Sequence, residues 1–318
     1  MGSGAITATD LTRTFETGRR SRRRVVEAVR GISFVVEPGE RVAFIGPNGA
    51  GKSTSIKMLT GILHPTSGAA TVAGMVPWAD RRRLAERIGT LFGQRSQLWA
   101  ELPSRAAYSM LAAIHGVDDD EAARRVAELG ELLGATDLFD QPVRTLSLGQ
   151  RMRCELAAAL LHQPQILMLD EPSIGLDLVA KQRFRDLLVT LNKQRGTTIL
   201  LTSHDVADIE VVADRTIIVN HGRIIIDDTV EAMRRTLLAS KRVEVGLVHP
   251  VEVSSIDILG ATLTRADATR LTFDVDTSLA AVRDVVDAVL DTLPVADLSV
   301  VDPPLEEVIA GVYEAGSS

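Results

Sequence analysis

The feature that most constrains this chain is a glycine-rich run of eight residues, 46–53, between an apolar segment and a helical pattern. It fits G-x-x-x-x-G-K-S, in which glycines let the backbone wrap around a phosphate chain while amide groups and a helix start donate to it. Lys52 adds positive charge near the outer phosphates, and Ser53 offers a hydroxyl to Mg²⁺. The residues predicted to bind a nucleotide here are Gly46, Pro47, Asn48, Gly49, Ala50, Gly51, Lys52, Ser53 and Thr54.

Two adjacent carboxylates follow a second apolar segment, 166–169. Asp170 ends the predicted strand and is placed to hold Mg²⁺, directly or through water, whereas Glu171 is placed to polarise the water that attacks a terminal phosphate. Taken alone, such a pair is also an ordinary strand ending. The phosphate-binding loop earlier in the chain favours the catalytic interpretation.

Short β-rich runs alternate with helical patterns from residue 5 to about 235, which predicts an α/β domain over 1–235. Aromatic residues make up only 3% of the chain, so its core is expected to consist mainly of Val, Ile, Leu and Ala. Strand patterns are missing between Pro103 and His162, which indicates a helical insertion at about 95–162. The predicted strands are 5–11, 32–37, 41–45, 69–72, 88–92, 166–170, 197–202, 216–220 and 223–226.

The pattern changes near residue 236, and a small α+β C-terminal domain is predicted over 236–318. Strands are expected at 242–247, 271–275 and 295–301, with helices at 278–293 and 304–313. Within the helical insertion, the acidic run at 118–121 is interpreted as a helix start rather than a metal site, because negative charge there meets the positive end of the helix dipole.

Charge and composition exclude several classes of protein. With 35 Lys and Arg against 42 Asp and Glu, the net charge is −7, which argues against nucleic acid as a partner. No apolar run reaches the roughly 18–20 residues of a membrane helix, and the N-terminus lacks the pattern of a secretory leader. Cys154 is the single cysteine, so no intrachain disulfide can form. A buried position for it and a cytosolic location are expected.

A third segment adds a specific resemblance. Leu146-Ser147-Leu148-Gly149-Gln150 resembles the signature LSGGQ of ATP-binding cassette (ABC) proteins. The resemblance implies a RecA-like core with an antiparallel β-subdomain, and a head-to-tail dimer with a second copy of the chain. In that dimer Ser147, Gly149 and Gln150 close on the ATP and Mg²⁺ held by the other copy. Leu148 departs from the family glycine; a branched residue is expected to lose positive φ and so hinder close approach to the γ-phosphate.

The same resemblance assigns four further residues. His204 is similar to the switch histidine that contacts the γ-phosphate, and Asp177 to the D-loop aspartate at the dimer interface. Each also has a structural alternative, since a histidine after a strand and an aspartate before a helix are common. Gln94 resembles the glutamine that senses Mg²⁺, with Gln97 as the competing candidate. Phe15 falls where the family places an aromatic against adenine, or else is a core residue.

The segments 92–99, 146–153 and 304–309 resemble the bacterial ABC-2 branch of exporters. The resemblance implies an ATPase that powers export through a separate integral membrane permease, from the cytoplasmic face of the cell membrane. An importer ATPase is the alternative within transport. A soluble ABC clamp for DNA repair or translation is disfavoured, because the loop-to-signature interval holds no long coiled coil and there is one phosphate loop. A regulator without hydrolysis is disfavoured by Lys52, Asp170, Glu171 and His204.

Two segments are candidates for membrane contact. The arginine-rich run at 19–24 is either a solvated loop or a contact for acidic lipid head groups. Leu98, Trp99 and Leu102 either form an exposed apolar patch for a partner helix or pack inward. The sequence does not encode the transported substrate, because the pathway lies in the partner chain.

Overall fold

A computed structural model describes residues 6–17, 24–92, 96–203, 205–233, 240–251, 258–277 and 279–301. Contacts divide the chain into two units, Met1–Asp228 and Thr229–Ser318. The first unit contains two sheets and the helical insertion, and the second contains one sheet with a helix. Each unit is described separately below.

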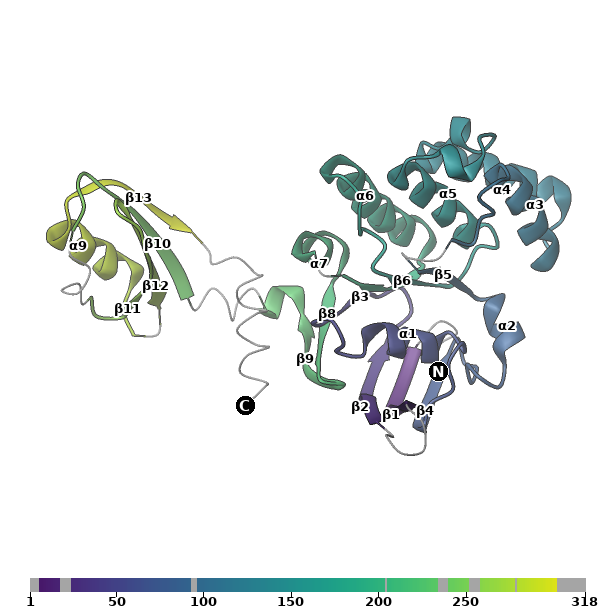
Figure 1. Cartoon of the computed structure of the whole chain (residues 1–318), viewed down its shortest axis with the longest axis horizontal. Coiled ribbons are helices and arrows are strands. Elements are labelled where there is room, and N and C mark those ends of the chain that lie inside the picture. Colours follow the sequence, from purple (N-terminus) through teal and green to yellow (C-terminus); the bar gives the residue numbers. More distant parts are fainter. Residues whose placement is uncertain are drawn as a thin grey trace. The chain divides into compact units, whose positions relative to one another are not determined.

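A six-stranded sheet forms the centre of the first unit, in the order β5-β6-β7-β3-β8-β9. Its pairs from β5 to β8 are parallel, so their carboxyl ends share one edge, where ligands of open α/β sheets bind. Helices cover both faces, with α5, α6 and α7 on one and α1 on the other (Figure 1). The central strands are therefore almost wholly apolar. Bounds are β3 Arg41–Ile45, β5 Ile88–Phe92, β6 Ile166–Asp170, β7 Thr198–Thr202, β8 Arg215–Asn220, β9 Arg223–Thr229, α1 Lys52–Leu59, α2 Arg81–Ala85, α6 Leu178–Arg195 and α7 Val206–Val212.

An antiparallel sheet in the order β2-β1-β4 packs beside α1. Its strands are β1 Ile6–Thr17, β2 Arg24–Val36 and β4 Ser67–Val72. Ile6 pairs with Val36 on one side and Val72 on the other, and Phe34 meets Phe44 of β3 with ring centroids 5.6 Å apart. Strands β1 and β2 are longer than the predicted 5–11 and 32–37, because their added halves pair with each other despite exposed side chains.

The insertion is helical as predicted, with α3 Ser104–Ile114, α4 Asp119–Leu133 and α5 Leu148–Leu160, and short 3-10 turns at Thr136–Leu138 and Val143–Thr145. The acidic run starts α4: the Asp118 carboxylate accepts a hydrogen bond from the Asp120 amide. Tyr108 packs edge-on against Phe139 and donates to the carbonyl of Cys154 at 3.0 Å. Cys154 is fully buried, as expected.

The second unit is an antiparallel sheet, β11-β12-β10-β13, packed against α9. Its elements are β10 Ser240–Leu247, β11 Ala261–Ala266, β12 Arg270–Asp276, α9 Val282–Thr292 and β13 Val295–Val301. Strand β11 was not predicted, because it is short, lies at the sheet edge and has mostly exposed side chains. The helix predicted at 304–313 lies outside the described residues. Among the described residues, no helix has both the length and the apolar character needed to cross a bilayer.

Candidate functional site

The phosphate-binding loop is folded around its own lysine. Lys52 begins α1 and is 5% exposed, and its Nζ donates to the carbonyl oxygens of Gly46 at 2.6 Å and Pro47 at 3.2 Å. Gly51 makes the turn into the helix at φ 106°, where a Cβ would lie 2.4 Å from the Ala28 carbonyl oxygen. Only glycine fits there. Asn48 and Gly49 are exposed at the tip of the loop.

Two carboxylates lie beside this lysine. Lys52 Nζ is 3.7 Å from Glu171 Oε1. Burial lowers the pKa of Lys52, and the negative charges of Glu171 and Asp170 oppose that shift. The partly desolvated ammonium can exchange its backbone carbonyl partners for phosphate oxygens, which are stronger, charged acceptors.

Asp170 joins three elements at the carboxyl edge of the sheet. Its Oδ1 accepts hydrogen bonds from Ser53 Oγ at 3.0 Å and Thr202 Oγ1 at 2.8 Å. Thr202 was not predicted from the sequence to belong to the site, although it ends β7 in register with Asp170. A carboxylate and a hydroxyl within reach of each other are the hard oxygen ligands that Mg²⁺ prefers, so Asp170 and Ser53 fit a magnesium ion.

Glu171 has an unusual backbone. Its φ is 53°, in the left-handed region that non-glycine residues rarely occupy. The Glu171 amide donates to both the carbonyl oxygen, at 3.1 Å, and Oγ1, at 2.9 Å, of Thr202. These two bonds hold the strained residue and turn its carboxylate toward Lys52.

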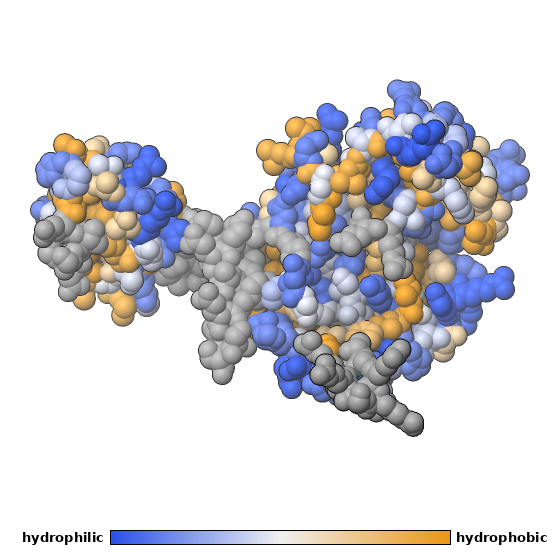
Figure 2. Space-filling view, in the orientation of Figure 1, coloured by the Kyte–Doolittle hydropathy of each residue, from blue (hydrophilic) through white to orange (hydrophobic). Residues whose placement is uncertain are grey.

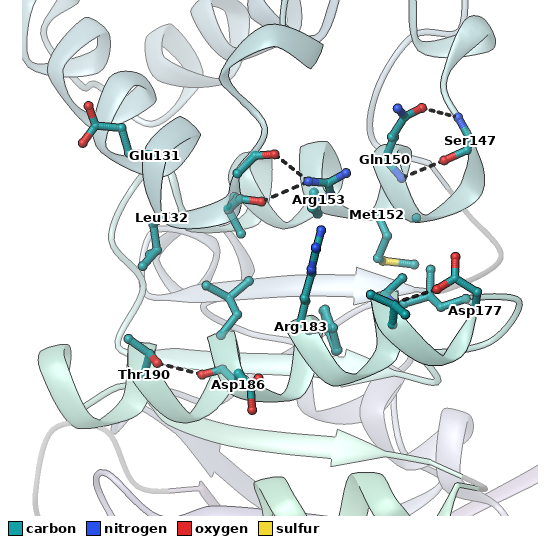
Figure 3. Close-up of a pocket in the computed structure, with 18 residues that line it drawn as sticks. Glu131, Leu132, Ser147, Gln150, Met152, Arg153, Asp177, Arg183, Asp186 and Thr190 are labelled. Carbon is teal, nitrogen blue, oxygen red and sulfur yellow. Dashed lines mark hydrogen bonds between the residues drawn. The ribbon is translucent and has the colours of Figure 1, made fainter.

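The signature segment starts helix α5 through a reciprocal cap. Ser147 Oγ accepts from the Gln150 amide at 3.3 Å, and Gln150 Oε1 accepts from the Ser147 amide at 2.8 Å (Figure 3). Leu148 is the first helical residue and is not among those with positive φ. Leu148 therefore has no positive φ, as expected of a branched residue, and the hindrance of its side chain to the γ-phosphate stays a prediction.

The D-loop segment contacts the signature segment. Gly175 has φ 75°, and a Cβ there would lie 2.4 Å from Leu148 Cδ2, so the Leu148 side chain rests on Gly175. Asp177 caps α6 by accepting from the Ala180 amide at 2.8 Å. Ser147, Gly149, Gln150 and Asp177 all border a pocket of about 770 Å³ between α4, α5 and α6 (Figure 3). The starts of α5 and α6 thus border the same pocket.

Phe15, Gln94 and His204 are the remaining residues predicted to contact the nucleotide or Mg²⁺. Phe15 is half-buried on β1, with the Arg13 guanidinium 4.7 Å from its ring centroid. Gln94 and His204 lie outside the described residues. Gln97, the competitor of Gln94, donates through Nε2 to the Thr90 carbonyl oxygen at 2.6 Å, and its amide donates to Glu155 Oε2 at 3.0 Å.

A phosphate loop, an acidic strand end and a capped signature helix on a mainly parallel sheet define a P-loop nucleotide-binding protein. Comparisons with known proteins narrow this class. The family model for ABC transporters matches residues 29–174. An ABC transporter ATP-binding protein, NatA of Bacillus subtilis, is 32% identical over 72% of this chain and 91% of its own length. The chain belongs to the ABC transporter ATP-binding proteins and is an ATPase of that family.

Further matches agree with the fold. The methionine import ATP-binding protein MetN of Geobacillus kaustophilus is 35% identical over 69% of this chain and 64% of its own length. A solved dimeric ATP-binding cassette, in a post-hydrolysis state bound to ADP and Pi, superposes with a TM-score of 0.64 at 22% identity, over 70% of this chain and 98% of that one. The α/β P-loop fold predicted from the sequence is therefore confirmed.

Proposed function

We propose that this chain powers an exporter, as one of two ATPase copies bound to a separate membrane permease at the cytoplasmic face of the cell membrane. The observation that carries the hydrolytic part is the cluster in which Lys52, Asp170 and Glu171 converge at one sheet edge. The transport part rests on membership of the ABC transporter ATP-binding proteins.

In the proposed reaction, water attacks the γ-phosphorus of ATP and the bond to the β–γ bridging oxygen breaks, leaving ADP and phosphate. Glu171 accepts the proton of the attacking water. Lys52 exchanges its carbonyl partners for phosphate oxygens and stabilises their charge. Mg²⁺ bound by Ser53 and Asp170 would neutralise further phosphate charge. His204 and Gln94 are proposed to contact the γ-phosphate and Mg²⁺, and Phe15 to stack on adenine.

Two copies are proposed to act together. Ser147, Gly149 and Gln150 lie on an exposed helix start, whose amide groups suit a phosphate supplied by another molecule. Head-to-tail pairing would place this surface of one copy over the phosphate loop of the other, with Asp177 at the contact. The dimeric state of the solved cassette supports an assembly of two copies.

An apolar surface of the helical insertion is the proposed permease contact. Trp99 and Leu102 are 48% and 37% exposed, whereas Leu98 is 6% exposed and packs into the core. On α3, Met110 and Ile114 are also exposed, and hydrophobic side chains appear at this outer edge of the insertion in Figure 2. We expect a permease helix to cover Trp99 and Leu102. Residues 19–23 of the arginine-rich run lie outside the described residues, and Arg24 begins β2.

The direction of transport is proposed from the resemblance of 92–99, 146–153 and 304–309 to the ABC-2 branch. The likeness to a methionine import protein favours the second candidate, an importer subunit. Glu171→Gln tests both the hydrolytic part and the transport part of the proposal. We expect turnover to fall by about 10²- to 10⁴-fold while ATP binding, measured by equilibrium dialysis, is kept. Wild-type turnover in this variant would remove Glu171 as the base.

The same variant, tagged and purified from detergent-solubilised membranes with ATP, identifies the partner by mass spectrometry. A stoichiometric polytopic protein without a substrate-binding protein supports export. A substrate-binding protein beside it would establish import instead, and a ribosome, a DNA-repair complex or no membrane protein would overturn the transport proposal. Trp99→Ser serves as a second test, because it should weaken co-purification and leave ATP binding unchanged.

A further inference from the structure

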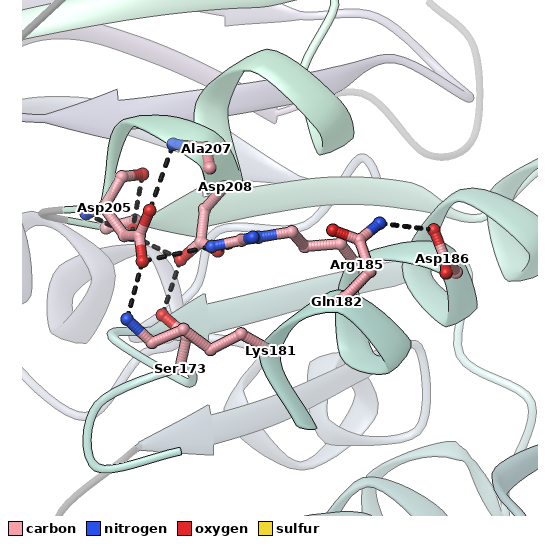
Figure 4. Close-up of polar contacts among 9 residues, drawn as sticks. Ser173, Lys181, Gln182, Arg185, Asp186, Asp205, Ala207 and Asp208 are labelled. Atoms are coloured by element: carbon pink, nitrogen blue, oxygen red, sulfur yellow. Dashed lines mark hydrogen bonds and ion pairs between the residues drawn. The ribbon is translucent and has the colours of Figure 1, made fainter. Parts of the chain in front are cut away.

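A buried carboxylate behind the nucleotide cluster receives hydrogen bonds from three separate segments. Asp208 lies on α7, and its side chain is 3% exposed. Arg185 of α6, 4% exposed, donates through Nε to Asp208 Oδ1 at 2.6 Å. Both serine hydroxyls, Ser173 Oγ at 2.5 Å and Ser203 Oγ at 2.6 Å, donate to the other oxygen, Oδ2 (Figure 4). The carboxylate is thus paired and hydrogen-bonded on both oxygens.

A second carboxylate extends this network. Asp205 Oδ2 is 2.6 Å from Lys181 Nζ and 3.0 Å from Nη2 of Arg185. Asp205 Oδ1 accepts from the Ala207 amide at 3.0 Å and so caps α7 (Figure 4). Arg185 therefore bridges two carboxylates, one inside the protein and one partly exposed, and fixes α6 relative to α7.

The two serines link this network to segments with proposed roles in hydrolysis. Ser173 lies between Glu171 and the D-loop residues Gly175 and Asp177, and Ser203 directly precedes His204. Because both hydroxyls end on one oxygen of Asp208, a shift of either segment changes the hydrogen bond of the other. The D-loop belongs to the proposed dimer contact, whereas residue 204 belongs to the proposed γ-phosphate contact.

We infer that Asp208, held by Arg185, is a positioning residue that couples the D-loop to the segment carrying His204. This inference rests on the proposed function. It touches no substrate. Its effect is on the geometry of hydrolysis after ATP has bound, so it acts on kcat and not on ATP affinity. A merely structural ion pair between α6 and α7 would instead change stability alone.

The test removes one hydroxyl at a time and leaves the ion pair intact. Ser173→Ala and Ser203→Ala in the full chain should each lower kcat by about tenfold with KM for ATP unchanged. Ser104→Ala is the matched control, since Ser104 is fully buried in the helical insertion and donates to the Phe139 carbonyl oxygen. We expect wild-type kcat there.

Asp208→Asn, combined with each serine variant, gives a double-mutant cycle. If both serines act through the carboxylate, each alanine change adds little to kcat in the Asp208→Asn background, because the shared acceptor is already altered. Glu40→Gln, which weakens the Arg215 pair at 3.2 Å elsewhere in the unit, controls for lost ion pairing and should lower Tm only. Unchanged kcat in Ser173→Ala and Ser203→Ala, or fully additive effects in the double variants, would overturn the inference.

Failure of this inference is distinguishable from failure of the proposed function. Glu171→Gln should abolish turnover whether or not Asp208 couples the segments. If Glu171→Gln is inactive while both serine variants keep wild-type kcat, only the coupling is lost. Normal turnover in Glu171→Gln would contradict the proposed function itself. Should Asp208→Asn not fold, the serine variants still decide the question, because they retain the Arg185 ion pair.

Discussion

The two units of the chain bury different kinds of residues. In the first, polar or charged side chains are buried near the carboxyl edge of the sheet and behind it, among them Lys52, Thr202 and Asp208. Among the described residues of the second, no polar or charged side chain is buried, and its core is Val, Leu, Ile and Phe. Because a buried polar group costs free energy unless it is paired, its presence marks a site that does chemistry or positions it. The described core of the second unit is therefore held by apolar packing.

The largest effect expected from this contrast is the loss of Lys52. Lys52→Ala should lower ATP turnover by about 10²- to 10³-fold, because the ammonium folded into the phosphate loop is lost. ATPase assays measure this loss of turnover, and ATP-binding assays accompany them. Arg265→Ala in the second unit is the matched control, as this exposed arginine pairs with Asp267 at 3.1 Å on the surface. Equal loss in both variants would break the assignment of chemistry to the first unit.

Packing of the second unit is tested by Phe273→Ala. Phe273 is 1% exposed, and truncating such a side chain costs about 3–5 kcal/mol of unfolding free energy. Both tryptophans, Trp78 and Trp99, lie in the first unit. Circular dichroism should therefore show an earlier transition in urea that tryptophan fluorescence does not follow. A matching shift of the fluorescence transition would show that the two units unfold together.

Acid should destabilise the first unit through a stacked histidine pair. The rings of His115 and His162 stack 4.0 Å apart, and burial, followed by the neighbouring His115, lowers the pKa of His162 to about 4. The unfolded chain takes up this proton near pH 6.5, whereas the folded chain does so only near 4. Stability present at neutral pH is therefore lost as pH falls through this range, by about 2 kcal/mol between pH 7 and 5.

Urea unfolding followed by tryptophan fluorescence at the two pH values measures this loss. His162→Gln should remove most of the His162 contribution, while His249→Gln, an exposed histidine of the second unit, leaves the pH dependence of the first unit unchanged. Equal pH dependence in wild type and His162→Gln would show that other groups carry the acid sensitivity.

Local patterns made much of the first unit predictable. The loop at 46–53, the apolar strand before Asp170 and the acidic start of α4 each depend on neighbours in sequence, and the structure has all three. What escaped prediction depends on distant residues. Thr202 reaches Asp170 only because β6 and β7 are in register, and the positive φ of Glu171 is held by that same threonine.

The same limit explains two other differences. The network around Asp208 joins residues from three segments, and no spacing in the sequence indicates that they meet. Strand β11 alternates Ala261 and Leu263 with threonines over only four residues, so it is defined mainly by its backbone pairing with β12. Pairing partners, not local propensity, decide such elements.

The smallest effect concerns Leu148, which departs from the family glycine and whose side chain rests on Gly175 in the structure. If the branched side chain held off the γ-phosphate, Leu148→Gly would raise turnover by more than tenfold. Because Leu148 is already helical and rests on Gly175, we expect turnover within about threefold and stability lower by about 1 kcal/mol. Turnover assays and urea unfolding distinguish these two outcomes.

Leu178→Gly is the matched control, since Leu178 is the first residue of α6 and is 78% exposed. It carries the same cost of glycine at a helix start without a contact comparable to that on Gly175. The difference in unfolding free energy between the two variants therefore isolates the packing of Leu148 against the D-loop. If that difference is absent while turnover rises in Leu148→Gly, the side chain acts as a barrier to the nucleotide and not as a support for the loop.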